Sequence, residues 1–263
     1  MNRLKNLFAR KNKNVLNVYC TAGFPKLDST LEVLKALQDG GADIIELGMP
    51  YSDPLADGEV IQQSSNVALK NGMTMQLLFE QLKNLRKSPS AGGIGGAIPV
   101  ILMGYMNPVL QYGFEKFCAG AASAGIDGLI LPDLPQHEFE ATYGKLIKKY
   151  GLDFIFLITP ETSAARVKRL DELSSGFLYA VSSSSTTGKD KDFADVEKYL
   201  QRIQTYGLKN PVLAGFGVKD KNTFQSVSKY ASGAIIGTAY ISALQKANNI
   251  EAATKNFLNE ILK

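Results

Sequence analysis

The sequence predicts an α/β fold, a closed (β/α)8 or TIM barrel, on three observations. Eight short apolar runs are spread along the chain, and each is followed by a segment with helical spacing of apolar residues. These runs are continuously apolar, which is typical of parallel strands buried on both faces. The length of 263 residues is close to the ~250 residues of such barrels. An open, doubly wound sheet is the alternative, and the eightfold count argues against it.

The expected strands are, in order, 15–20, 44–47, 98–103, 128–131, 154–158, 177–181, 212–214 and 234–236. The expected helices are 31–38, 62–69, 75–85, 114–122, 138–149, 166–173, 196–206, 224–227, a short one through Ala243 and a final one at 250–262. An extra N-terminal helix, with Leu4, Leu7 and Phe8 on one face, should cap the core. No linker or change of composition divides the chain, so residues 1–263 are expected to form a single domain.

Cap and breaker residues mark several of these boundaries. Asp28 or Ser29 can cap the 31–38 helix at its start, and Gly40-Gly41 ends it. Asn71-Gly72 separates the two helices that follow the second strand. The short apolar runs are therefore strands joined to helices by turns, as a repeating strand–helix chain requires.

The composition narrows the class of protein. Hydrophobic residues make up 45% of the chain and charged residues 21%, with a dispersed net charge of +4. That charge suits an anionic metabolite and is too scattered to indicate nucleic acid. The longest apolar run, 97–106, is shorter than the ~20 residues of a membrane span, and the N-terminus lacks a signal-peptide pattern. With two cysteines only, a cytoplasmic protein without disulfides is expected. The single His137 is interpreted as exposed, and no metal site is expected.

The most unusual stretch runs from Asp43 to Gly58. Glu46 lies inside the apolar strand 44–47, where a charge is costly unless it is paired or functional. The strand then breaks, and the loop after it carries Asp53 and Asp57. Two carboxyl groups in different environments are a common way to run acid and base chemistry at neutral pH. Asp53, which precedes a proline, is interpreted as a turn former.

Turns after the last two strands predict a phosphate site. In barrels of this kind the chemistry lies at the carboxyl ends of the strands. Gly217 follows the seventh strand, and Gly237-Thr238 opens the short helix after the eighth. Backbone N–H groups and a helix N-terminus can hold a phosphate there. These glycines could instead only make tight turns, but two such turns on adjacent strands favour the phosphate site.

Two other segments resemble phosphate loops less clearly. Gly188 ends the Ser- and Thr-rich segment 182–188, which could add a third phosphate contact and should be mobile, as a lid would be. The same segment could equally be only a flexible loop. The glycine-rich segment 91–96 precedes a strand, which places it on the opposite face of the barrel, and we interpret it as a connector.

The residues from Glu46 to Gly58 resemble the most specific motif of the tryptophan synthase alpha subunit family. Shorter matches lie at 6–8, 107–108, 128–135, 215–218 and Gly237, so the resemblance covers essentially the whole chain. It implies a (β/α)8 lyase that cleaves indole-3-glycerol phosphate to indole and glyceraldehyde 3-phosphate by a retro-aldol reaction. It also implies that indole passes to a pyridoxal-phosphate-containing beta subunit in an α2β2 tetramer, in the last steps of L-tryptophan biosynthesis. No cofactor or metal is implied in this chain.

The resemblance also assigns roles by motif position. Glu46 and Asp57 correspond to the family's catalytic Glu and Asp, and Tyr179 to an active-site tyrosine. The family's phosphate-binding positions are Gly188, Gly217, Gly237 and Thr238. Thr238 replaces a more usual Ser, which leaves a backbone contact possible. The lid departs further, because Ser185-Thr186-Thr187-Gly188 stands where the family commonly has Gly-Val-Thr-Gly, with Ser183 where an Arg is frequent.

The chemistry of this cleavage agrees with the residues. The reaction needs a proton added at indole C3, a proton removed from the side-chain hydroxyl, and an anion near the ring nitrogen as it becomes positive. A partly buried Glu46 has its pKa raised toward neutrality and can act as general acid–base. Asp57 can accept a hydrogen bond from the indole N–H and stabilise the positive charge.

Three other functions remain open. One is a stand-alone lyase that releases free indole from the same substrate. Another is a different sugar-phosphate barrel, such as an isomerase or epimerase, against which the spacing of Glu46 and Asp57 argues. A third is a catalytically silent partner that only activates a beta subunit, which two intact carboxyl groups make less favourable.

Overall fold

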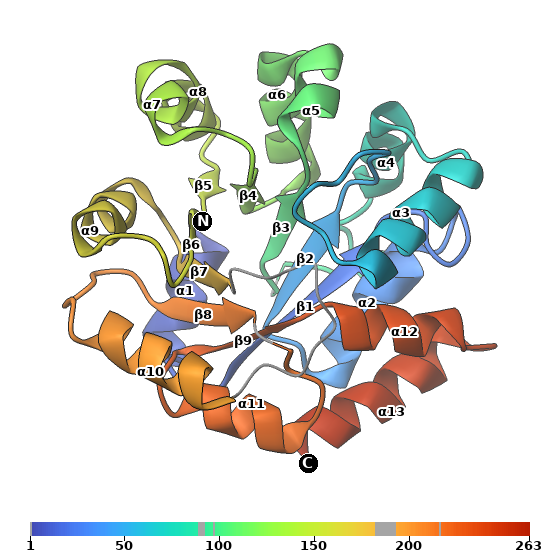
Figure 1. Cartoon of the computed structure of the whole chain (residues 1–263). Helices are drawn as coiled ribbons and strands as arrows, with labels where there is room; N and C mark the ends of the chain where they lie inside the picture. The colour runs from blue at the N-terminus through green and yellow to red at the C-terminus, as the bar shows by residue number, and fades with distance from the viewer. Residues whose placement is uncertain (1, 89–92, 97, 182–192, 216) are drawn as a thin grey trace.

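The fold is a parallel sheet wrapped into a barrel, with helices around its outside (Figure 1). The computed structural model describes residues 2–88, 93–96, 98–181, 193–215 and 217–263. The strand order is β5-β4-β3-β2-β1-β9-β8-β7-β6, and every neighbouring pair is parallel. The strands are β1 (Val15–Thr21), β2 (Ile44–Gly48), β3 (Val100–Met103), β4 (Gly128–Ile130), β5 (Asp153–Phe154), β6 (Leu157–Ile158), β7 (Leu178–Val181), β8 (Val212–Gly215) and β9 (Gly233–Ile236).

The ring closes through the predicted fifth strand, which the structure divides into β5 and β6. Just after β5, the Ile155 N–H donates to the carbonyl of Leu129 on β4 at 3.0 Å. One residue later, the Phe156 carbonyl accepts from the Tyr179 N–H on β7, also at 3.0 Å. The chain therefore bonds first to one neighbour and then to the other. The nine short strands that the described residues form occupy eight positions around the barrel, which confirms the predicted (β/α)8 fold.

The barrel interior is filled by apolar side chains that alternate along the strands with outward-facing ones. This interior cluster consists of Leu4, Leu7, Val15, Ile44, Ile101, Ile130, Ile155, Phe177, Leu213 and Ile235. The other face of the strands packs on the helices in a second, larger cluster. Two layers of apolar contacts, one inside the barrel and one outside, explain why the strand sequences are continuously apolar.

Helix α1 (Arg3–Arg10) closes the amino end of the barrel, as its amphipathic pattern predicts. Its Leu4 and Leu7 side chains are buried in the interior cluster. The Phe8 ring lies 6.2 Å from the ring of Phe177, which immediately precedes β7. Because this end is plugged by apolar side chains, access to the interior is left to the carboxyl ends of the strands.

The remaining helices surround the sheet (Figure 1). They are α2 (Thr30–Gly40), α3 (Glu59–Lys70), α4 (Met75–Leu82), α5 (Met106–Tyr112), α6 (Phe114–Ala124), α7 (Gln136–Glu138), the π-helical turn η2 (Phe139–Tyr143), α8 (Gly144–Lys149), α9 (Ala164–Leu173), α10 (Phe193–Gln204), α11 (Lys221–Ser228), α12 (Thr238–Gln245) and α13 (Ile250–Leu262). Within the described ranges, none of them is long and apolar enough to cross a membrane.

Two local details differ from the sequence-based expectation. The residues Asn107-Pro108 belong to none of the expected helices but lie in the first turn of α5, where a proline removes no helical hydrogen bond. Ser29 does occupy the position before α2, yet its side chain makes no capping hydrogen bond. The end of α2 is as expected, because Gly41 adopts a φ of 98° that favours glycine.

The register of β1 and β2 places the site. Tyr19 of β1 lies opposite Glu46 of β2, and Thr21 lies opposite Gly48. A Cβ atom at position 48 would lie 2.0 Å from the Tyr19 hydroxyl oxygen, so only glycine fits at the end of β2. The last residue of β2, Gly48, lies one interior position beyond Glu46 and closely approaches the Tyr19 side chain.

Candidate active site

Glu46 lies inside the barrel near its open end. Strand β2 carries it one interior position beyond Ile44, and its side chain is 1% exposed. The Nδ2 of Asn17, on the neighbouring strand β1, donates to Glu46 Oε2 at 2.9 Å. The prediction that Glu46 lies in a buried strand is confirmed, and its carboxyl group is paired with a neutral amide.

Asp57 lies in the loop between β2 and α3 and is 7% exposed. The loop is fixed from within, because the Asp57 N–H donates to the Pro54 carbonyl at 3.1 Å and the Gln62 amide donates to the Asp57 carbonyl at 2.8 Å. Tyr105, which follows β3, fixes it from outside. Its hydroxyl oxygen accepts from the Ala56 N–H at 3.1 Å, and its hydroxyl hydrogen bonds to the Asp57 carboxylate.

Burial gives the two carboxyl groups different proton affinities. Burial, with a smaller contribution from the charge of Asp57, raises the pKa of Glu46 to about 8, although the Asn17 hydrogen bond opposes the rise. Burial also raises the pKa of Asp57 to about 6, and the Tyr105 hydrogen bond opposes that rise. At neutral pH Glu46 therefore holds a proton while Asp57 is mostly ionised. One buried group can donate a proton, and the other supplies a negative charge.

Tyr179 shares this part of the barrel. It lies on β7 and is partly exposed. A Cβ atom on Gly215 of β8 would lie 2.6 Å from its ring, so this glycine gives the ring its space. Burial raises the pKa of Tyr179, and the charges of Glu46 and Asp57 raise it further. The three predicted residues thus interact electrostatically, and Tyr179 stays neutral.

The predicted glycine turns lie on adjacent strands of the same barrel. Gly217 follows β8, is exposed and has a φ of 51°, which favours glycine. Gly237 immediately precedes α12, whose first residue is the exposed Thr238. The Ile241 N–H is bonded to the Gly237 carbonyl at 3.0 Å, and the N–H groups of the first turn ahead of it have no partner within the helix. Gly188 and the expected lid, 182–188, lie outside the described residues.

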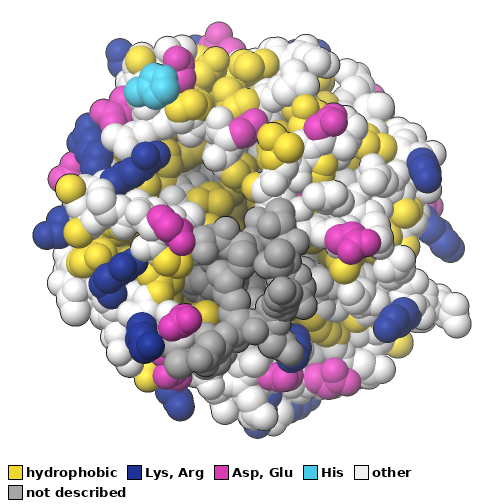
Figure 2. All heavy atoms as spheres, in the orientation of Figure 1, with side chains coloured by type: hydrophobic (Ala, Val, Ile, Leu, Met, Phe, Trp, Pro, Cys, Tyr) yellow, Lys and Arg dark blue, Asp and Glu magenta, His cyan; other side chains and the backbone are white. Residues whose placement is uncertain are grey.

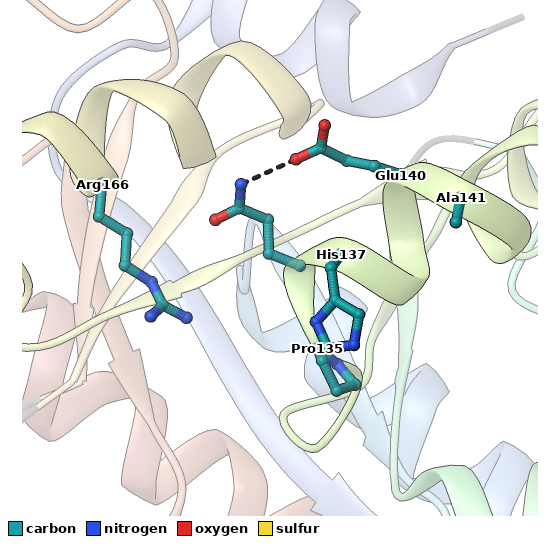
Figure 3. Close-up of a pocket in the computed structure, with 6 residues that line it drawn as sticks. Pro135, His137, Glu140, Ala141 and Arg166 are labelled. Carbon is teal, nitrogen blue, oxygen red and sulfur yellow. Dashed lines mark hydrogen bonds between the residues drawn. The ribbon is translucent and has the colours of Figure 1, made fainter.

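A surface hollow on the rim is separate from this site (Figure 3). It is lined by Pro135, Gln136, His137, Glu140, Ala141 and Arg166, and Gln136 Nε2 donates to Glu140 Oε1 at 2.7 Å. His137 is 79% exposed, as predicted. On the face shown in Figure 2, the side chain of this histidine (cyan) lies near the upper left edge. Lys and Arg side chains are scattered on the same face among Asp and Glu. Neither of the buried carboxyl groups lines the hollow, so it is not the candidate active site.

The structure adds polar groups that the sequence-based assignment left out. Tyr105 holds the Asp57 loop, Asn17 bonds Glu46, and the Tyr19 hydroxyl accepts from Thr21 Oγ1 at 3.4 Å. Tyr105 had a signal, since it follows a strand end. Asn17 had one too, as a lone polar residue in the apolar run 15–20. Among the described residues, no three His, Cys, Asp or Glu side chains form a group that could hold a metal.

A parallel barrel that gathers two buried carboxyl groups near its open end belongs to the class of (β/α)8-barrel enzymes. The family model described as tryptophan synthase alpha chain matches residues 5–262. Among curated relatives, the tryptophan synthase alpha chain of Flavobacterium johnsoniae is 47% identical over 99% of this chain and 100% of its own length. That of Parabacteroides distasonis is 47% identical over the full length of both chains.

Solved structures agree with the sequence comparison. Tryptophan synthase subunit alpha from Legionella pneumophila superposes with a TM-score of 0.89 at 32% identity, over 99% of this chain and 97% of that one. A chain of tryptophan synthase from M. tuberculosis gives a TM-score of 0.82 at 30% identity, over 99% and 100%. The chain belongs to the tryptophan synthase alpha chain family. It is thus a lyase of tryptophan biosynthesis whose family reaction is the cleavage of indole-3-glycerol phosphate.

The raised pKa of Glu46 predicts a pH-dependent effect on stability. The folded protein holds this proton more tightly than the unfolded chain, because the pKa is about 8 instead of 4.5. The stabilisation is complete below about pH 4.5 and is lost as the pH rises through about 8. A glutamine at this position does not titrate, so Glu46→Gln lacks this loss of stability. The free energy of unfolding of Glu46→Gln, relative to that of the parent, should therefore rise between about pH 5 and about pH 9. Urea unfolding at several pH values measures this.

The exposed Glu260 on α13 supplies the matched control for that measurement. Glu260→Gln makes the same chemical change at an exposed position, so it shows what the loss of a carboxyl group alone does to stability over this range. A Glu46→Gln protein whose stability follows that of Glu260→Gln at every pH would contradict the raised pKa of Glu46.

Proposed function

We propose that this chain cleaves indole-3-glycerol phosphate with Glu46 as the general acid–base and Asp57 as the group that stabilises positive charge on the indole ring. The observation that carries the proposal is the pair of buried carboxyl groups with pKa values of about 8 and about 6. Near neutral pH this pair offers a proton donor and an anion at the same time, which is what the first step requires.

The reaction proceeds in two proton transfers. Protonated Glu46 gives its proton to indole C3, and the ring nitrogen becomes positive. Asp57 accepts a hydrogen bond from the ring N–H and lowers the energy of that charge. The Glu46 carboxylate then removes the proton of the side-chain hydroxyl. The bond from C3 to the side chain breaks, its electron pair returns to the ring, and indole and glyceraldehyde 3-phosphate form with Glu46 protonated again.

The remaining predicted residues bind the substrate. Backbone N–H groups at Gly217, Gly237 and Thr238 receive the phosphate, because the start of α12 presents a partial positive charge there. Gly188 adds a further phosphate contact, and Tyr179 lies against the substrate beside Glu46. The chain works without a metal or an organic cofactor, since both proton transfers use the carboxyl group of Glu46.

The proposal extends to the setting of the chain. It acts as one domain, residues 1–263, because β1 pairs with both β2 and β9 and so joins the two ends of the sequence. It works in the cytoplasm, in an α2β2 assembly with a beta subunit that carries pyridoxal phosphate and consumes the indole. The family to which the chain belongs supports that partner.

Substitution of the two carboxyl groups tests the mechanism. Glu46→Gln should lower kcat by about 10²- to 10⁴-fold, because it removes the proton donor and acceptor. Asp57→Asn should lower kcat by about 10²-fold, because it removes the charge beside the ring nitrogen. Steady-state indole release measures both, with circular dichroism as the check on folding.

Asp53→Asn is the matched control, since Asp53 is an exposed carboxylate of the same loop. The control should keep the parent's kcat. Near-normal turnover by a folded Glu46→Gln protein would remove Glu46 from the mechanism. Loss of activity in the control as well would mean that the loop, and not the carboxyl group of Asp57, is responsible.

Indole release by the purified chain, alone and with a tryptophan synthase beta subunit, tests the partner. Slow cleavage that rises sharply with the beta subunit is the expected result, since the partner consumes indole and the family works as a complex. Fast cleavage that the beta subunit leaves unchanged would identify a stand-alone lyase. Absence of cleavage under both conditions would contradict the catalytic proposal and favour a silent partner.

A further inference from the structure

Asn17 is a fully buried polar residue among the apolar side chains of the barrel interior. It is 0% exposed. Its strand partners are Ile44 on β2 and Ile235 on β9, both members of the interior cluster. Two residues before it on β1 lies Val15, which is also in that cluster. The surroundings would suit an apolar side chain, so the amide needs a reason to be there.

The hydrogen bonds of Asn17 are incomplete in one specific way. Its Nδ2 donates to Glu46 Oε2 at 2.9 Å. Its Oδ1 is buried and has no hydrogen-bond partner in the part of the chain that the structure describes. A buried polar atom without a partner costs about 1–3 kcal/mol. A leucine of similar shape would avoid that cost, so the amide is a poor choice for packing alone.

We propose that Asn17 is a positioning residue that holds the Glu46 carboxyl group in one orientation in both of its protonation states. This inference rests on the proposed role of Glu46 as general acid–base. An amide carries a donor and an acceptor in nearly the same space. Nδ2–H donates to Glu46 when it is ionised. After a half-turn of the amide, Oδ1 accepts from the Glu46 hydroxyl when it is protonated, which satisfies the unpaired oxygen.

The other groups around Glu46 cannot supply this function. Asp57, on the loop above, repels the ionised form and favours the proton on Glu46. Tyr19 on β1 and Tyr179 on β7 sense the charge of Glu46, and burial keeps both neutral. Among the described residues, Asn17 is the hydrogen-bond partner of the Glu46 side chain. It is therefore the group that favours the carboxylate and fixes its direction.

The substitution Asn17→Leu tests the inference in the full-length chain. It removes the donor and the acceptor with little change of shape. Loss of a hydrogen bond to a charged group should lower kcat by about 10- to 100-fold. KM for indole-3-glycerol phosphate should stay within about twofold, because the proposed phosphate contacts follow β7, β8 and β9, and none of them follows β1.

A direct titration separates positioning from a structural role. The carbon-13 shift of the Glu46 carboxyl group, assigned by its absence in Glu46→Gln, reports the pKa of this residue. That pKa should be higher in Asn17→Leu than in the parent. The amide's hydrogen bond to the charged carboxylate is stronger than its hydrogen bond to the neutral acid, so loss of the amide destabilises the ionised form more. A purely structural amide would leave both the titration and kcat unchanged.

Two further variants keep the test decisive. If Asn17→Leu does not fold, Asn17→Ala removes the same amide without adding an apolar branch, and the same changes are expected. Thr254→Val is the matched control, since it removes a buried hydrogen bond of 2.8 Å to Tyr240, at the contact of α12 and α13. The control should lower stability and leave kcat and the Glu46 titration unchanged.

The outcomes separate this inference from the function on which it rests. Near-normal turnover by Glu46→Gln would overturn the proposed function. An inactive Glu46→Gln, together with an Asn17→Leu protein whose kcat and Glu46 titration match the parent, would overturn only the inference. A rise in KM with kcat preserved would also overturn it, because it would place Asn17 in substrate binding.

Discussion

The burial of one carboxyl group inside a closed barrel is the constraint on which the rest of the site depends. Glu46 is 1% exposed and lies one interior position beyond the apolar Ile44 on β2, so ionising it is costly. The surrounding residues moderate that cost without removing it. Asn17 supplies one hydrogen bond from below, and no cation partners Glu46 among the described residues. The result is a carboxyl group that stays protonated near neutral pH and can still lose its proton. A carboxyl group with a full set of hydrogen-bond or charge partners would be held in one protonation state.

The closed sheet also sets the spacing between the proposed acid–base group and the proposed phosphate site. Strand β1 pairs with β2 on one side and with β9 on the other. The proposed acid–base group, Glu46, therefore lies on one neighbour of β1, and the glycine turn before α12 follows the other. Helix α1 blocks the opposite end of the barrel. In the proposed function, the substrate with its phosphorylated side chain enters at the carboxyl ends of the strands, where both sets of groups lie.

Much of the fold follows from local sequence, and the exceptions have physical reasons. Continuous apolar runs located all eight strand positions because most of the strand residues, on both faces, are buried. The division of 154–158 into β5 and β6 depends on hydrogen bonds to two different neighbours, which no local pattern records. At the site, Glu46 was visible as a charge in an apolar run. The support that Tyr105 gives to Asp57 joins residues far apart in sequence. Asn17 carried the same kind of signal as Glu46, but its meaning depends on the register of β1 and β2.

The pH dependence of kcat/KM for indole-3-glycerol phosphate tests the central claim most directly, because it reports the groups of the free protein. The account predicts a bell-shaped profile. Activity should fall below a pH of about 6, where Asp57 takes up a proton, and above about 8, where Glu46 loses the proton that it must donate. A profile that stays flat from about pH 5 to about pH 9 would contradict the claim that burial sets the acid and the base of this reaction.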